Sequence, residues 1–596
     1  MFFTTRALWL LYFYFNAWLI IKWRLYNGLH VTDYLVLAVG FLLIFLYSEA
    51  INKLIKPVFL RVGLSIFLIC LYYIAGKYHY RVKTNFDLVV FVSNFRETFN
   101  AASGDVILNT MKLKDFYETL ALIPILLLFQ FKWKVFSLKR GLSQFKGILY
   151  LASYFALIFC IPYPFGEISY SVKSIVESFK PMKAKSEYEV TEIIDSQFDQ
   201  IRKPNIILIS IESFNGLYVN KKTVTGKEIT PVFNSLIGEG LYIEDFYGNS
   251  VQTIKGQFAT YCSQIPLIHG KASYELNAKL LNCMPKELAK LGYESYFHKC
   301  YQNVNFDNTY NFMVDIGFDH VLKTDIEKFS QKQKRENIWG WGPQDDLSYK
   351  QFVKNIKKFN KNSGKPIFAT IHTVSHHMKF GNVPVDQREL FPKQNSKEEA
   401  FLNSLNVTDK YLGTLVDELK NAELYDNSLI IITADHSYPN GEHGFYDAQT
   451  SYFQEFFKIP FLAIWKGEIM PKIIKDKTYS LVDIFPTVLD LMGVSTKINS
   501  AGTSMLDNKG STALLVQPYN GIILSAVKWP YKLVWQKKSG RKLLYNLITD
   551  PKEEHPLEDQ DELVTSLWDK MDYIIFSENY LMEKKSLSRK LLTVSE

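Results

Sequence analysis

The sequence is poor in cysteine, with five among 596 residues, and it contains no Cys-x-x-Cys pair. This absence argues against a zinc site built from thiolates. Internal repeats and low-complexity tracts are also missing. The net charge is +8, yet much of the excess lies in loops between apolar segments, and no basic stripe with interleaved aromatic residues follows them. Nucleic acid is therefore not an expected partner.

Long apolar runs are confined to the part of the chain before about residue 165. Five such segments begin at Leu8, Tyr34, Val58, Thr119 and Gly147. Most of them approach the length of about 20 residues that crosses a bilayer as a helix. We therefore predict a transmembrane domain of about five α-helices over residues 1–165. A removable N-terminal signal peptide does not explain a series of this kind.

Basic residues between these segments set the predicted orientation. The loops "NKLIKPVFLR", between segments two and three, and "KWKVFSLKRGLSQFK", between four and five, are strongly basic. Short basic loops of membrane proteins face the cytoplasm. We therefore expect the N-terminus inside and everything after Phe165 outside the membrane.

The chain after residue 165 has a different pattern of polar and apolar residues. Residues 166–203 are polar with sparse apolar residues and predict a linker or juxtamembrane helix. Apolar runs then alternate with helix-like stretches across residues 204–596, at 205–211, 292–298, 365–373, 428–435 and 459–465. Buried strands that alternate with helices predict a doubly wound α/β sheet with largely parallel strands. The later segment "YKLVWQKKSGRKLLYNL" alternates like a β-hairpin.

The cysteines divide between the two parts of the chain. Cys70 and Cys160 lie in apolar segments, whereas Cys262, Cys283 and Cys300 lie in the part expected outside the cytoplasm. One disulfide is permitted there, with one thiol left over. We favour Cys262 with Cys283 as the pair.

Polar residues follow several predicted strands at the points where these end. Ligands bind at the carboxyl ends of parallel strands, so these residues are candidates for a shared site. The set comprises Glu212, Asp435 and His436, and the histidines His372, His376 and His377. Carboxylates and imidazoles are suitable ligands for a divalent cation, which lowers the pKa of a coordinated hydroxyl.

Thr253 lies in the turn-rich stretch "YGNSVQTIKGQFATYCSQIPL", residues 247–267. A threonine hydroxyl is a poor nucleophile at neutral pH unless a base or a metal activates it. A loop that brings Thr253 to Glu212 and Asp435 would place its hydroxyl next to a metal ion bound there. Thr253 is then a candidate nucleophile toward a phosphorus or sulfur ester.

The motifs resemble the sulfatase-like branch of the alkaline phosphatase superfamily. The resemblance is carried by the threonine stretch and by "NIILISIESF", "GKEITPVFNSL", "SLIIITADHS" with "GEHGF" behind it, and "LVDIFPTVLDLMGV". Five membrane segments before such a domain look like the lipoteichoic acid synthase and phosphoglycerol transferase families. "TIKGQFATYCSQIPL", "WGWGPQDD" and "TVSHH" are most similar to the phosphoglycerol transferase I type, which decorates periplasmic glucans. The resemblance implies an alkaline-phosphatase-like soluble domain.

The resemblance also implies a site. The family pattern places the metal ligands at Glu212, Thr253, Asp435 and His436, with Thr253 also the nucleophile. His377 and His298 match substrate-binding positions, although "KCYQNVNFDN" after His298 differs from the tryptophan and arginine pattern of teichoic acid synthases. The implied cofactor is a divalent metal, Mn²⁺ first, with Zn²⁺ or Mg²⁺ as alternatives.

The implied reaction moves phosphoglycerol from phosphatidylglycerol to an extracytoplasmic glycan or polymer. It passes through a phospho-threonine intermediate and releases diacylglycerol. The implied location is the bacterial inner membrane, with the bilayer as a partner and the catalytic domain facing the periplasm.

Three other functions are compatible with parts of the pattern. A phosphoethanolamine transferase acting on lipid A or another envelope glycan shares the nucleophile, the metal and the membrane anchor, but such enzymes usually carry several disulfides. A sulfatase needs a C/S-x-P-x-R motif, which the stretch around Thr253 lacks. A catalytically silent binding module requires the loss of at least one ligand, and all four positions are intact.

Overall fold

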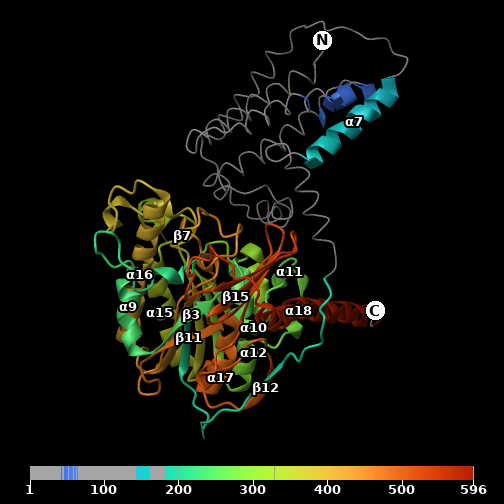
Figure 1. The fold of residues 1–596 in the computed structure, drawn as a ribbon. Coiled ribbons are helices and arrows are strands. Elements are labelled where there is room, and N and C mark those ends of the chain that lie inside the picture. Colours follow the sequence, from blue (N-terminus) through green and yellow to red (C-terminus); the bar gives the residue numbers. More distant parts are fainter. Residues whose placement is uncertain are drawn as a thin grey trace. The chain divides into compact units, whose positions relative to one another are not determined.

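The structure is a computed structural model that describes part of the chain. The described residues are scattered positions between 42 and 64, residues 143–160, and residues 182–594 apart from 199 and 328. The chain divides into two compact units, Met1–Lys180 and Pro181–Glu596. Each unit is considered by itself (Figure 1).

The first unit carries the predicted membrane segments. The segments that begin at Leu8 and Thr119 lie outside the described residues, and those at Tyr34 and Val58 are described only at some positions. The fifth segment overlaps the helix α7 (Ser143–Cys160). Within the described residues, no helix combines the length and apolarity needed to cross a membrane. The membrane domain therefore stays a prediction.

The second unit is built on an eight-stranded sheet in the order β11-β3-β10-β9-β2-β8-β4-β5. Its neighbouring strands run parallel except where β10 pairs antiparallel with β3 and β9. The strands are β2 (Asn205–Ile211), β3 (Leu241–Tyr247), β4 (Glu294–Lys299), β5 (His320–Lys323), β8 (Ile367–His372), β9 (Ser428–Ala434), β10 (Phe461–Ile464) and β11 (Lys472–Ser480). The five apolar runs coincide with β2, β4, β8, β9 and β10, which confirms the predicted α/β sheet.

Helices cover both faces of this sheet. Figure 1 shows α9 (Pro231–Leu236), α15 (Asp345–Ser363) and α16 (Lys397–Asn421) on one side, and α10 (Thr253–Cys262), α12 (Met284–Lys290) and α17 (Ile484–Leu491) on the other. The central strands β8 and β9 are consequently buried at every position. Burial on both faces explains why these strands are continuous apolar runs rather than alternating ones.

A short strand lies within the predicted linker or juxtamembrane helix, where the structure describes that region. Within 166–203, residues 191–194 form β1 (Thr191–Ile194), which pairs antiparallel with β12 (Thr496–Asn499). The β-branched residues of "TEII" favour an extended backbone. The pairing ties the start of the second unit to the segment after α17.

The C-terminal part is a separate four-stranded antiparallel sheet. It contains β13 (Ala513–Gln517), β14 (Ile523–Lys528), β15 (Tyr531–Gln536) and β16 (Lys542–Asn546), and α18 (Asp561–Val594) packs on it. The pairing of β15 with β16 confirms the predicted hairpin. Asn249, in the loop before Thr253, accepts the Val516 N–H at 2.9 Å and donates to Leu514 O at 3.0 Å. This sheet therefore holds the loop that leads to Thr253.

The disulfide joins Cys262 to Cys283, as favoured from the sequence. Cys262 is the last residue of α10, and Cys283 directly precedes α12. Cys300 is a free cysteine, and it is buried. The cross-link fixes the far end of the helix that begins with Thr253.

Candidate active site

Four neighbouring strands of the central sheet bring polar side chains to one edge. Asp435 directly follows β9, Glu212 directly follows β2, and His372 is the last residue of β8. Lys299 is the last residue of β4 and lies opposite His372 in the β4–β8 register. Because these strands are parallel, their carboxyl ends meet at the same edge. All four residues are buried, at 1–4% exposure.

Thr253 reaches this edge as the first residue of α10. Its hydroxyl donates to Glu212 Oε2 at 3.5 Å. The helix can approach so closely because position 256, one turn later, is glycine. A Cβ on Gly256 would lie 2.1 Å from Asp435 O. The N-terminus of α10, where the helix dipole is positive, therefore points into the site and favours anionic groups there.

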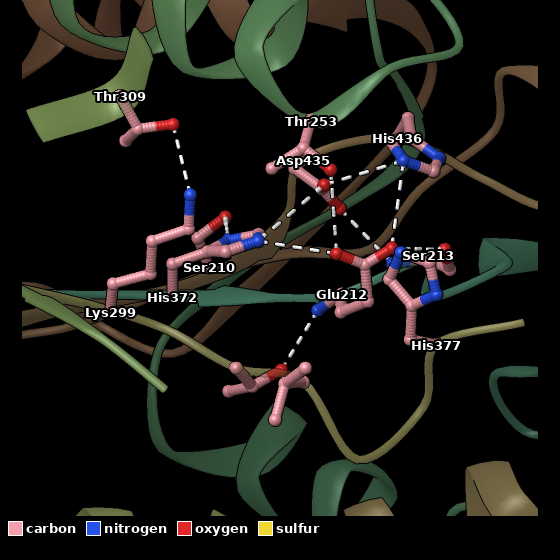
Figure 2. A network of polar contacts seen from close by, with 12 residues as sticks. Ser210, Glu212, Ser213, Thr253, Lys299, Thr309, His372, His377, Asp435 and His436 are labelled. Carbon is pink, nitrogen blue, oxygen red and sulfur yellow. Dashed lines mark hydrogen bonds and ion pairs between the residues drawn. The ribbon is translucent and has the colours of Figure 1, made fainter. Parts of the chain in front are cut away.

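The Glu212 carboxylate lies at the centre of the cluster (Figure 2). Ser213 Oγ donates to its Oε1 at 2.6 Å, and His372 Nε2 lies 3.2 Å from Oε2. Burial alone would raise the pKa of Glu212. The imidazoles of His377, His372 and His436 outweigh burial and hold this pKa below its ordinary value. Glu212 is therefore an anion at neutral pH.

Asp435 and His436 complete the cluster. Asp435 Oδ1 accepts the Ser213 N–H at 3.0 Å, while Oδ2 is buried and accepts no hydrogen bond from the described residues. His436 Nδ1 lies 2.9 Å from Ser437 O, so this nitrogen carries the proton and donates it to the carbonyl. The other ring nitrogen, His436 Nε2, lies 3.4 Å from Asp435 Oδ2. Burial lowers the pKa of His436, but the Asp435 and Glu212 carboxylates raise it above its ordinary value.

The donor set suits a divalent cation. One ligand atom each from Glu212, His372 and Asp435 lies within 4.8 Å of the others. The unsatisfied Asp435 Oδ2 is costly in a buried site unless a cation or a proton approaches it. Carboxylate oxygens combined with imidazole nitrogens are ligands that Zn²⁺ and Mn²⁺ accept. The residues present therefore fit a metal ion.

A cavity adjoins the cluster on the side of β8 and β4. Its lining includes Glu212, Thr253, His372, His377, Lys299 and Trp341. His377 is held at this wall because its ring packs 4.3 Å from Trp341, measured between centroids, while Trp341 Nε1 donates to Met378 O at 2.6 Å. The sequence-predicted substrate residue His377 thus lies beside the predicted nucleophile.

His298 is not among the residues that line this cavity, and its predicted substrate contact stays a prediction. His298 is 1% exposed, its Nε2 lies 3.0 Å from Thr324 Oγ1, and its ring packs edge-on against Phe352. Burial lowers the pKa of His298 to about 4. Successive side chains of a strand point to opposite faces. The cavity-facing residue at the end of β4 is therefore Lys299.

Sequence reasoning brought together Glu212, Thr253, Asp435 and His436 but did not assign roles to His372 and Lys299. Three histidines lie near the end of one predicted strand. Only the structure shows that His372 is the last residue of β8 and that the other two follow the strand. Lys299 had a weaker signal, its position at the last residue of a predicted parallel strand.

A largely parallel α/β sheet with a carboxylate–imidazole cluster and a helix-terminal hydroxyl at its strand ends is the arrangement that the resemblance to the alkaline phosphatase and sulfatase class implies. Residues 204–494 match the family model described as Sulfatase. The chain therefore carries a sulfatase-family domain.

Two curated relatives are similar to about half of the chain. Lipoteichoic acid synthase-like YvgJ of Bacillus subtilis is 25% identical over 342 residues, which cover 54% of this chain and 52% of the relative. Lipoteichoic acid synthase of Staphylococcus saprophyticus is 29% identical over 324 residues, covering 52% and 48%. The chain thus spans about half the length of the curated relatives it matches.

Solved structures show the same fold. The lipoteichoic acid synthase LtaP from Listeria monocytogenes has a TM-score of 0.54 at 21% identity, covering 69% of this chain and 97% of that one. An alkaline phosphatase superfamily protein from Vibrio parahaemolyticus has a TM-score of 0.55 at 19% identity, covering 69% and 95%. These likenesses support the assigned fold of the second unit.

Proposed function

We propose that this protein transfers phosphoglycerol from phosphatidylglycerol to an extracytoplasmic glycan or polymer. The observation that carries the proposal is the convergence of the Thr253 hydroxyl with Glu212, Asp435 and His436 beside one cavity. The curated relatives named lipoteichoic acid synthase support a phosphoglycerol transferase rather than a sulfatase. The missing C/S-x-P-x-R motif agrees with this assignment.

A divalent cation, Mn²⁺ in the first instance, would be held by Glu212, Thr253, Asp435 and His436. Such an ion supplies Lewis acidity and lowers the pKa of a hydroxyl bound to it. His372 has a different role in this scheme. Its Nε2–H donates to the ionised Glu212, and its Nδ1, 3.3 Å from Ser210 Oγ, accepts from that hydroxyl. His372 therefore orients the carboxylate from behind.

The reaction has two displacements at phosphorus. In the first, Thr253 Oγ1 forms a bond to the phosphorus, the bond to the diacylglycerol oxygen breaks, and diacylglycerol leaves with a proton while Thr253 loses one. In the second, an acceptor hydroxyl forms the new P–O bond, gives up its proton, and Thr253 leaves and regains one. His377 and the N-terminus of α10 border the cavity and would stabilise negative charge on the phosphoryl oxygens.

The proposed location follows from the donor lipid. Apolar segments over residues 1–165 would anchor the enzyme in the bacterial inner membrane, and the basic loops would place the catalytic domain outside the cytoplasm. Phosphatidylglycerol in the outer leaflet is then reached by diffusion in two dimensions.

The test is the intact mass of the full-length protein after manganese loading, incubation with phosphatidylglycerol or phosphatidylethanolamine, and acid quenching. We expect a glycerophosphoryl increment with phosphatidylglycerol that is absent from Thr253→Ala. Thr260→Ala is the matched control, because Thr260 is a buried threonine of the same helix that does not line the cavity. A phosphoethanolamine increment would move the assignment to a phosphoethanolamine transferase. No adduct with either lipid would overturn the proposal.

A further inference from the structure

Lys299 is a buried cation in the wall of the reaction cavity. Its side chain lies on the His372 side of the site, and its Nζ donates to Thr309 Oγ1 at 2.9 Å and to Phe306 O at 3.4 Å (Figure 2). Lys299 lines the same cavity as Glu212 and Thr253. Held by fixed oxygen atoms, this ammonium group lies at a defined position next to the reacting centre.

Other charged groups lie in or next to the wall around Lys299. The carboxylate of Asp307 also lines the cavity, but Lys271 Nζ lies 2.6 Å from its Oδ1, and both side chains are below 10% exposure. Lys271 therefore balances the charge of Asp307, and the anionic Glu212 is a second carboxylate in the lining of the cavity. The aromatic rings of Tyr301 and Phe306 lie with their centroids 5.9 Å and 5.8 Å from Lys299 Nζ and limit its access to water.

We propose that Lys299 selects the donor headgroup, by donating hydrogen bonds to the phosphodiester and glycerol oxygens of phosphatidylglycerol and by repelling the ammonium group of phosphatidylethanolamine. The proposal rests on the phosphoglycerol transfer proposed above and names its specificity-determining residue. Glycerol offers only oxygen acceptors and hydroxyl donors, so it can pair with a lysine. An ethanolamine ammonium would be desolvated beside a like charge, where repulsion is weakly screened.

The main test compares headgroup preference in Lys299→Met. Full-length protein, loaded with manganese, is given phosphatidylcholine vesicles that carry labelled phosphatidylglycerol or labelled phosphatidylethanolamine. Loss of a charge-assisted hydrogen bond should reduce phosphatidylglycerol turnover about 10- to 100-fold. Turnover of phosphatidylethanolamine should not fall, so the ratio of the two rates should drop at least about tenfold. Lys299→Arg should keep the preference, because it keeps the charge.

Lys458→Met is the matched control for loss of a partly buried, ion-paired lysine. Lys458 forms an ion pair with Asp245 at 2.7 Å, and its side chain is 15% exposed, but neither residue lines the cavity. This variant should lose stability and keep the ratio of the two rates. Thermal unfolding of each variant shows whether the compared proteins are folded.

A binding measurement separates this inference from the proposed function. Calorimetry with soluble glycerol phosphate and phosphoethanolamine should show a preference for glycerol phosphate in the wild type and none in Lys299→Met. An unchanged preference in a folded Lys299→Met protein, in rates or in binding, overturns the role of Lys299. If the wild type turns over neither lipid, the proposed phosphoglycerol transfer is wrong. The binding preference for glycerol phosphate still tests whether Lys299 selects the headgroup.

Discussion

Replacing Gly256 by alanine should damage the site by moving α10. An added Cβ would lie 2.1 Å from Asp435 O and 2.8 Å from Asp435 C, whereas contacts below 3.0 Å are essentially never seen for real Cβ atoms. The obstructing atoms are backbone, so no side chain can rotate away. Either α10 or the Asp435 backbone must move by about 0.9 Å. Both carry groups of the proposed metal site.

The size of the effect follows from two opposing contributions. Overpacking of this kind costs about 1–3 kcal/mol, and alanine in a helix interior recovers about 1 kcal/mol relative to glycine. We therefore expect a net loss of up to about 2 kcal/mol in the free energy of unfolding, measured by chemical denaturation. A displacement near 1 Å at a reacting group can reduce the rate about 100-fold. Formation of the Thr253 adduct should therefore fall much more than stability does.

Gly413→Ala is the matched control. Gly413 also lies inside a helix, α16, and a Cβ there would meet the side chain of Val232 at an ordinary 3.5 Å. This substitution should stabilise the protein by about 0.5–1 kcal/mol and leave adduct formation unchanged. Equal stability and equal activity of Gly256→Ala and Gly413→Ala would show that the close approach of α10 to Asp435 does not restrict position 256.

Two further predictions concern groups outside the reacting cluster. His298→Gln should cost about 1 kcal/mol of unfolding free energy through the weakened contact with Thr324 and leave lipid turnover unchanged. A large loss of turnover at unaltered stability would instead support the substrate role predicted for His298. Burial raises the pKa of Asp409, whose carboxylate accepts the Val232 and Phe233 N–H groups, to about 7. A carboxyl whose pKa is higher when folded binds its proton more tightly in the folded state, so its contribution to stability is present below about pH 4 and is lost as the pH rises to about 7. Chemical denaturation at about pH 5 and about pH 8 gives the free energy of unfolding at each pH. This free energy should fall less from about pH 5 to about pH 8 in Asp409→Asn than in the wild type, and an equal fall in both proteins would contradict the raised pKa of Asp409.

The strand ends of the central sheet could be predicted from the sequence for a physical reason. Strands buried on both faces are continuous apolar runs, so the first polar residue after each run marks the carboxyl end of a strand. Glu212 and Asp435 are such residues, and the parallel arrangement places them together. Thr253 required the resemblance to a family, because a threonine in a turn-rich loop is usually a local hydrogen-bonding residue.

Other features of the fold and the site depend on three-dimensional contacts that the order of residues in the sequence does not reveal. His298 and Lys299 are adjacent, and only the direction of the pleat in β4 decides which one faces the cavity. The strand β1 forms because β12, about 300 residues later, offers an edge to it. The approach of α10 to Asp435 is likewise a tertiary contact, visible in the sequence only as one glycine among many.

The groups proposed to hold the cation are positioned by the protein before any ion binds. Ser213 has a φ of 57°, and this left-handed turn lets its N–H reach Asp435 Oδ1 while its hydroxyl reaches Glu212 Oε1. One atom of each carboxylate is thereby tied, as Nδ1 of His436 is tied to Ser437 O. Asp435 Oδ2 and His436 Nε2 lie 3.4 Å apart at the site, where the unsatisfied Asp435 Oδ2 is kept at a cost in stability. Such preorganisation implies that binding a cation relieves this cost without a large rearrangement, since the oxygen and nitrogen donors already lie close to one another.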